Sequence, residues 1–142
     1  MNMVYLLLYV IAAMIVGFVM VKTYLEKDRM RRYVIVLLVL AMICIVSYSV
    51  NFMTDNYNVM SAATSIMMSA QDFLLVSLFI YTTAFARISN KVTKVMTIAA
   101  FVIAIIDSVV FIANIFNEIA VKYSMVKCDG IYVLAYEGKL WF

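Results

Sequence analysis

The sequence predicts an all-α membrane protein, a bundle of four transmembrane helices with a short extracellular β-hairpin at its C-terminal end. Of its 142 residues, 68% are hydrophobic and 13% are charged. Soluble domains are about half apolar and about a quarter charged. The mean hydropathy of +1.07 likewise indicates a chain surrounded by lipid. Four apolar runs each reach the roughly 20 residues that a helix needs to cross a hydrocarbon core.

The four expected helices cover about 3–23, 33–54, 59–86 and 95–121. Backbone amides in lipid must be hydrogen-bonded within a helix or a closed barrel, and long runs without period-2 alternation favour helices. The last two runs exceed a minimal span, which predicts a tilt or a protruding turn. We expect the first run to be a retained helix rather than a cleaved signal peptide, because no positive charge precedes it and no small-residue cleavage site ends it.

Two of the three links between these helices are basic. The links at 24–32 and 87–94 hold most of the lysine and arginine, whereas the link DNYN holds Asp55 and no base. Basic links stay in the cytoplasm, so we expect the N-terminus and the C-terminal hairpin to be extracellular. The net charge of +3 therefore reflects orientation, and we expect no nucleic-acid partner. The basic residues in and beside the two links are Lys22, Lys27, Arg29, Arg31, Arg32, Arg87, Lys91 and Lys94.

The third expected helix carries an acid at its middle. Asp72 follows Gln71, and Ser61 and Ser65 fall on nearly the same face as its carboxyl. An ionisable side chain at bilayer depth is costly unless it faces protein or water, and small hydroxyl residues let helices approach closely. This face is therefore expected to point into the bundle rather than at lipid.

The fourth expected helix carries a polar stripe. Asp107, Asn114 and Glu118 follow at helical spacing, with Phe111 between them on the same face. The second helix adds polar residues in its outer half. Together they predict a shallow cavity, open to the outside and lined by the second, third and fourth helices. The candidate ligand-binding residues are Asp107, Asn114, Glu118, Asp72, Tyr48 and Asn51.

Structural explanations stay open beside this functional one. Serine residues in membrane bundles mostly hold helices together. A carboxyl removed from water favours its neutral form, so Asp72 and Asp107 are each either a protonated structural group or part of a site. Glu118 is either an interfacial residue or a ligand group.

The last part of the chain predicts a β-hairpin at about 123–137. Two short runs rich in tyrosine, valine and isoleucine are separated by Asp129 and Gly130. An Asp-Gly pair between such runs favours a type I′ turn. A hairpin on the outer side is placed to cover the predicted cavity.

The sequence offers no catalytic constellation. It has no histidine for acid–base chemistry, and its three glycines form no phosphate-binding loop. Two membrane aspartates are a requirement of intramembrane aspartyl proteases, but neither acid stands in a motif of that family. The twelve methionines form no paired motif that would bind copper. We therefore expect no enzymatic activity, no cofactor and no metal in this chain.

The features follow a particular order: an outer N-terminus, a basic link, two spans, a second basic link, IIDSVVFIANIF, and an external Asp-Gly hairpin ending in GKLWF. This order resembles the N-terminal seven-transmembrane sensory domain that precedes bacterial histidine kinases and diguanylate cyclases. In that family the fourth helix ends in an asparagine-centred motif, to which Asn114 corresponds. The segment Ile106-Asp107-Ser108 matches a version associated with the cyclase-linked members.

The resemblance covers about the first four of seven helices and departs after Asn114. The family commonly has a proline and one or two histidines there, whereas this chain has Ile115, Phe116, Asn117 and Glu118. Contacts made by those histidines are not implied here. The resemblance implies the leading piece of a longer sensor, or a truncated relative, with any kinase or cyclase activity in a domain absent from this chain. It also implies a homodimer formed through C-terminal helices or that output domain.

Three functions follow from these features. A sensory input module would detect an extracellular small ligand or an envelope condition and pass a shift between helix arrangements inward. A small multi-pass transporter would instead use a membrane-embedded carboxylate to exchange protons against a substrate. A membrane assembly partner has no ligand, and both aspartates would then tolerate asparagine with changes in stability alone. In all three cases the lipid bilayer is a partner.

Overall fold

The computed structural model describes residues 3–117, 121–128 and 131–138. It confirms the predicted fold class, because four helices long and apolar enough to cross a membrane are followed by one β-hairpin. The chain is thus a multi-pass membrane protein. The elements are α1 (Met3–Leu25), α2 (Arg31–Met53), α3 (Tyr57–Phe85), α4 (Lys91–Asn117), β1 (Val121–Cys128) and β2 (Ile131–Gly138).

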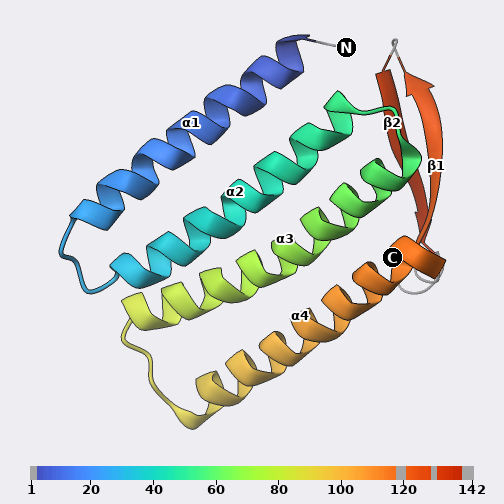
Figure 1. Cartoon of the computed structure of the whole chain (residues 1–142). Helices are drawn as coiled ribbons and strands as arrows, with labels where there is room; N and C mark the ends of the chain where they lie inside the picture. The colour runs from blue at the N-terminus through green and yellow to red at the C-terminus, as the bar shows by residue number, and fades with distance from the viewer. Residues whose placement is uncertain (1–2, 118–120, 129–130, 139–142) are drawn as a thin grey trace.

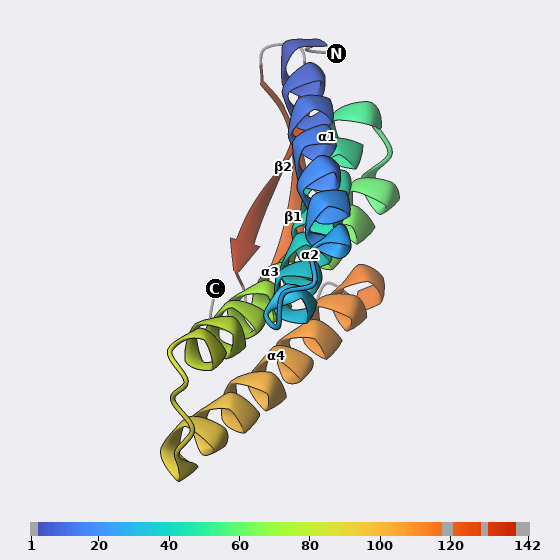
Figure 2. The same ribbon diagram turned by 90° about the vertical axis from the view of Figure 1, so that its left-hand side faces the viewer.

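The four helices lie side by side in chain order (Figure 1). Extensive contacts join α1 to α2, α2 to α3, and α3 to α4. The helices α1 and α4 therefore form opposite edges of the array, as the view in Figure 2 also shows. The consequence is that α3 has α2 on one side and α4 on the other.

The buried core is centred on α3, the helix that has a neighbouring helix on each side. The helix α3 buries the most residues, and many of them are small, such as Ser61, Ala63 and Ser65. Small side chains let neighbouring membrane helices approach closely. By contrast α1 exposes most of its leucine, isoleucine and valine side chains, which is the expected surface of a helix in lipid.

The helix ends differ from the predicted ends where side chains cap them. The helix α4 begins at Lys91 rather than 95, because the Asn90 Oδ1 atom accepts a hydrogen bond of 2.7 Å from the Thr93 amide. The helix α3 begins at Tyr57 rather than 59, because the Asn56 Oδ1 atom accepts from the Asn58 amide at 3.0 Å. Propensity and hydropathy alone place such ends poorly.

The predicted end of the fourth helix at 121 is wrong. The helix α4 ends at Asn117, and Val121 is already the first residue of β1. The Val121 amide donates a hydrogen bond of 2.9 Å to the Asn114 side chain, which replaces the helical bond that a continued helix would make. The hairpin therefore extends beyond the predicted 123–137, from Val121 to Gly138.

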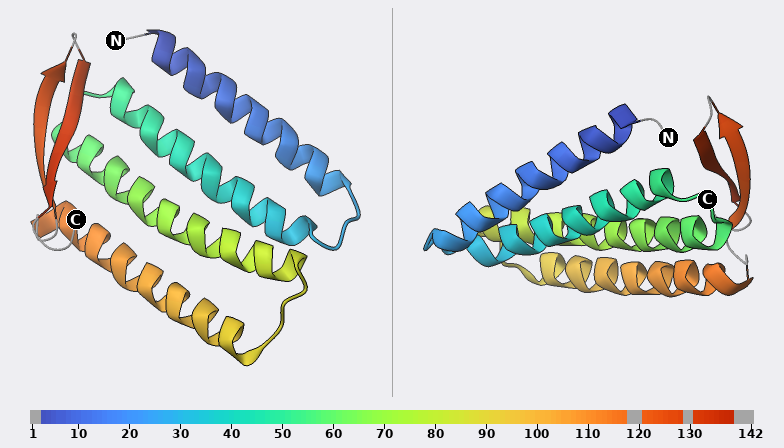
Figure 3. Two further views of the ribbon diagram at one scale, coloured as in Figure 1. Left: turned by 180° about the vertical axis from the view of Figure 1, so that it is seen from behind. Right: turned by 45° about the horizontal axis from the view of Figure 1, so that its top comes forward.

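The two strands pair antiparallel from Val121 with Gly138 to Cys128 with Ile131. This register leaves two residues between the strands; they are the predicted turn residues 129 and 130, which lie outside the described residues. Along β1 the side chains of Val121 and Tyr123 are buried, and those of Lys122 and Ser124 are exposed, as alternation in a strand requires. The hairpin crosses the end of the helical array opposite to both basic links (Figure 3).

Candidate functional site

The structure places both membrane aspartates on one cavity. This cavity of about 130 Å³ lies between α3 and α4, beneath β1. Asp72 lines it from α3 and Asp107 lines it from α4. The two acids therefore face one shared space. The other lining residues are Met68, Gln71, Phe111, Val121 and Tyr123.

Helical geometry explains this convergence. Met68 and Asp72 are four residues apart on α3, and Asp107 and Phe111 are four residues apart on α4, so each pair shares one helix face. Because α3 and α4 are direct neighbours, these two faces meet. Each helix thus gives the cavity one acid and one large apolar side chain.

The polar groups of this region are incompletely paired. Within the described part of the chain, the buried Asp72 Oδ2 atom has no hydrogen-bond partner, and the same holds for the hydroxyls of Ser69 and Ser108. Buried polar atoms normally have a partner in the protein or in ordered water. The cavity can therefore accept protons, several water molecules or a small ligand that donates hydrogen bonds.

Asn114 holds the hairpin to α4. Its Nδ2 group donates to the Val121 carbonyl at 2.9 Å, and its Oδ1 atom accepts from the Val121 amide at 2.9 Å. The side chain is fully buried. Asn114 thus ties the start of β1, and with it the cover of the cavity, to the helix that carries Asp107.

Tyr123 ties the hairpin to α3. Its hydroxyl lies 3.4 Å from the Ser65 hydroxyl, and the Tyr57 hydroxyl donates to its carbonyl at 3.4 Å. Phe111, Val121 and Tyr123 form one buried hydrophobic cluster beside these contacts. Sequence reasoning missed the contribution of Val121 and Tyr123, although their alternation with Lys122 and Ser124 could have indicated a strand from residue 121 onward.

The other predicted site residues lie elsewhere. The Tyr48 ring packs against Tyr9 and Phe52, with ring centroids 5.2 Å and 5.4 Å apart, between α1 and α2. Asn51 donates to the Thr64 hydroxyl at 3.1 Å, between α2 and α3. Glu118 lies outside the described residues. The structure therefore brings together Asp72 and Asp107, places Asn114 beside their cavity, and does not bring Tyr48 or Asn51 to it.

The cavity differs from the predicted one in its walls. We expected the second, third and fourth helices to line it, but α2 and α4 flank α3 on opposite sides. The residues that line it come from α3, α4 and β1. The hairpin replaces α2 as the third wall.

We expect the Asn51 contact to be structural. A double-mutant cycle with Asn51→Ala and Thr64→Ala should give a coupling free energy of about 0.6 kcal/mol, the mean for hydrogen bonds between membrane helices. Unfolding of the purified variants in mixed micelles measures this value. A coupling near zero would show that the 3.1 Å bond does not contribute to stability.

The cavity offers two carboxyls as possible cation ligands. Among the described residues, no group of three or more acidic, cysteine or histidine side chains is arranged to hold a metal ion. Comparisons of the chain with protein-family models, curated proteins and solved structures gave no match.

Proposed function

We propose that this chain is the membrane input module of a bacterial signal-transduction protein, and that the cavity between α3 and α4 is its detection site. The observation that carries the proposal is the contact of one strand with both helices that supply the acids. The Asn114 side chain bonds the start of β1 to α4, and the Tyr123 hydroxyl lies beside Ser65 of α3. A change inside the cavity therefore acts on the hairpin and on two helices at once.

The chemistry of the lining favours a small cationic ligand or protons. Among the described residues that line the cavity, two are carboxylic acids and none is lysine or arginine. An uncompensated pair of acids at bilayer depth is stabilised by any positive charge that reaches it. With the basic links in the cytoplasm, the hairpin side of the cavity faces the outside, where an extracellular ligand or a change in envelope pH arrives first.

The response is a shift between two helix arrangements. An empty cavity with two ionised acids pushes α3 and α4 apart, whereas a bound cation or a shared proton draws the two carboxyls together. A ligand shifts this equilibrium by its difference in affinity for the two arrangements. The basic link between α3 and α4 lies at the opposite end of the same helices, so the shift reaches the inner face (Figure 1).

Hydrogen exchange of the hairpin tests this proposal. We expect the protection of the β1 and β2 amides, in protein held in lipid nanodiscs, to differ between mildly acidic and mildly alkaline buffer after correction for intrinsic exchange. It should also change on addition of the diamine putrescine. The double variant Asp72→Asn/Asp107→Asn should lose both responses, because it has no carboxyl in the cavity.

The control variant is Asp55→Asn. Asp55 is an exposed acid in the link between α2 and α3, at the hairpin end of the molecule. Its replacement should leave both responses intact. The proposal is contradicted if the double variant responds as the unmodified protein does, at equal yields of inserted protein.

Proton-coupled transport is the second candidate, since two acids share a cavity inside the membrane. It requires that the cavity open alternately to both sides of the membrane. Substrate-dependent proton flux into proteoliposomes, abolished by Asp72→Asn, would favour the transporter over the sensor.

A further inference from the structure

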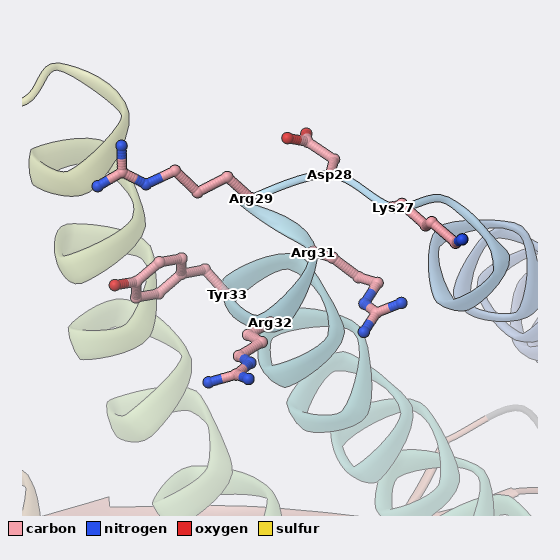
Figure 4. Close-up of a pocket in the computed structure, with 6 residues that line it drawn as sticks. All are labelled: Lys27, Asp28, Arg29, Arg31, Arg32 and Tyr33. Carbon is pink, nitrogen blue, oxygen red and sulfur yellow. The ribbon is translucent and has the colours of Figure 1, made fainter.

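A second polar region lies at the other end of the molecule, at the start of α2. A cleft of about 590 Å³ opens there on the surface. Its lining residues are Lys27, Asp28, Arg29, Arg31, Arg32 and Tyr33 (Figure 4). Four of these six side chains are cationic and one is acidic, so the cleft carries an excess of positive charge.

This positive charge is not neutralised within the described part of the chain. No carboxylate there forms an ion pair with the basic residues of the cleft. The single acid of the cleft, Asp28, accepts a hydrogen bond from the Met30 amide at 3.3 Å instead. Four bases without an ion-pair partner make this surface attractive to anions.

One base of the cleft is held in place. The Arg31 guanidinium donates to the carbonyls of Tyr24 and Glu26 at 3.2 Å and 3.4 Å, and it lies over the Tyr24 ring, 5.7 Å from its centre. These contacts fix the guanidinium between α1 and α2. An ordered guanidinium loses less freedom on binding an anion than a free side chain does.

The cleft lies where lipid headgroups lie. The membrane-spanning helix α2 begins at Arg31. Figure 4 shows the Arg32 side chain extending along α2, away from the link that joins it to α1, whereas the Arg31 guanidinium lies on the side of α2 that faces α1. The exposed Tyr33 ring beside them is of the type that anchors helices at a membrane interface. The cleft thus lies at the first turn of a membrane-spanning helix.

We propose that this cleft binds the phosphate group of an anionic membrane lipid. Arginine donors match phosphate oxygens in geometry and charge, and the lysine adds a further cation. Basic pockets beside transmembrane helices bind lipid headgroups by this chemistry. The site is independent of the carboxyl cavity and of the proposed sensory function.

Native mass spectrometry of the full chain, released from detergent, tests the proposal. Phosphatidylglycerol, the neutral-headgroup lipid phosphatidylcholine and the soluble ester glycerol 3-phosphate are each titrated. We expect one phosphatidylglycerol to be retained more tightly than either alternative. The double variant Lys27→Gln/Arg32→Gln should weaken its binding by about thirtyfold, the effect of two bases at an anionic surface.

The matched control is Lys91→Gln/Lys94→Gln, which removes two bases from the first turn of α4, at the same end of the molecule. It should weaken binding by less than about threefold, because neither lysine lines the cleft. Neither the Lys27 side chain nor the Arg32 side chain donates a hydrogen bond within the described chain, so the variant that replaces them should fold. Thermal unfolding in detergent checks the folding of both double variants.

Two results would overturn the proposal. Equal weakening by both double variants would show general attraction to the basic end rather than a site. Equal affinity for glycerol 3-phosphate and phosphatidylglycerol would identify a soluble phosphate, and not a lipid, as the occupant.

Discussion

Replacing Phe111 with alanine is expected to lower the free energy of unfolding by about 3–5 kcal/mol, the usual cost of removing a buried aromatic ring. Phe111 is 4% exposed and packs with Val121 and Tyr123 between α4 and the hairpin. Its loss leaves a void that joins the carboxyl cavity, because the same ring lines that cavity. Titration from mild detergent into dodecyl sulfate, followed by circular dichroism, measures the change.

The matched control lies on the same helix. Phe116 is 80% exposed on α4, and its ring faces the surroundings of the protein. Phe116→Ala should change the free energy of unfolding by less than about 0.5 kcal/mol, as expected for a surface substitution. Equal effects of the two substitutions would show that the cluster of Phe111, Val121 and Tyr123 does not stabilise the fold.

Much of this fold follows from the sequence. The four spans could be predicted because length and hydropathy determine whether a helix can cross a membrane. The hairpin could be predicted because an Asp-Gly pair separates two β-prone runs. The meeting of Asp72 and Asp107 could also be anticipated, since an acid at bilayer depth must turn toward protein and consecutive helices are usually neighbours.

The rest depends on contacts that no local pattern contains. Asn114 pairs with the backbone of Val121, seven residues later, and this pairing exists only because Val121 belongs to a strand and not to the helix. A periodic apolar pattern continues in the sequence beyond Asn117, which is why the sequence predicts a helix up to residue 121. Because the predicted helix extends to residue 121, the sequence does not predict that Val121 and Tyr123 line the cavity.

The second helix shows a different limit of sequence reasoning. The sequence groups Tyr48 and Asn51 with the acids because the outer polar residues of the second and fourth helices, with the two aspartates deeper, suit one cavity open to the outside. The side-by-side order of the helices places α3 between α2 and α4, so the polar residues of α2 meet other partners. Depth in the membrane could be predicted from the sequence, but the neighbours of each helix face could not.

Asn114 joins α4 to the hairpin through its two hydrogen bonds to Val121. Asn114→Ala is expected to destabilise the hairpin by about 2–4 kcal/mol, because the Val121 amide and carbonyl both lose their partner in a buried place. The variant Asn114→Asp should restore stability only where its carboxyl is protonated, since a carboxylate can accept from the Val121 amide but cannot donate to its carbonyl. Hydrogen exchange of residues 121–138 in nanodiscs measures the loss of protection.

Asn117→Ala is the control for this prediction. Asn117 is the last residue of α4 and is exposed, so its replacement should leave exchange of the hairpin unchanged. If the hairpin of Asn114→Ala were as protected as that of the control, its contacts with α3 through Tyr123 would suffice to hold it. The cover of the carboxyl cavity would then move with α3 alone. Loss of protection in Asn114→Ala, with retention in Asn117→Ala, would instead establish that β1 moves with the helix that carries Asp107.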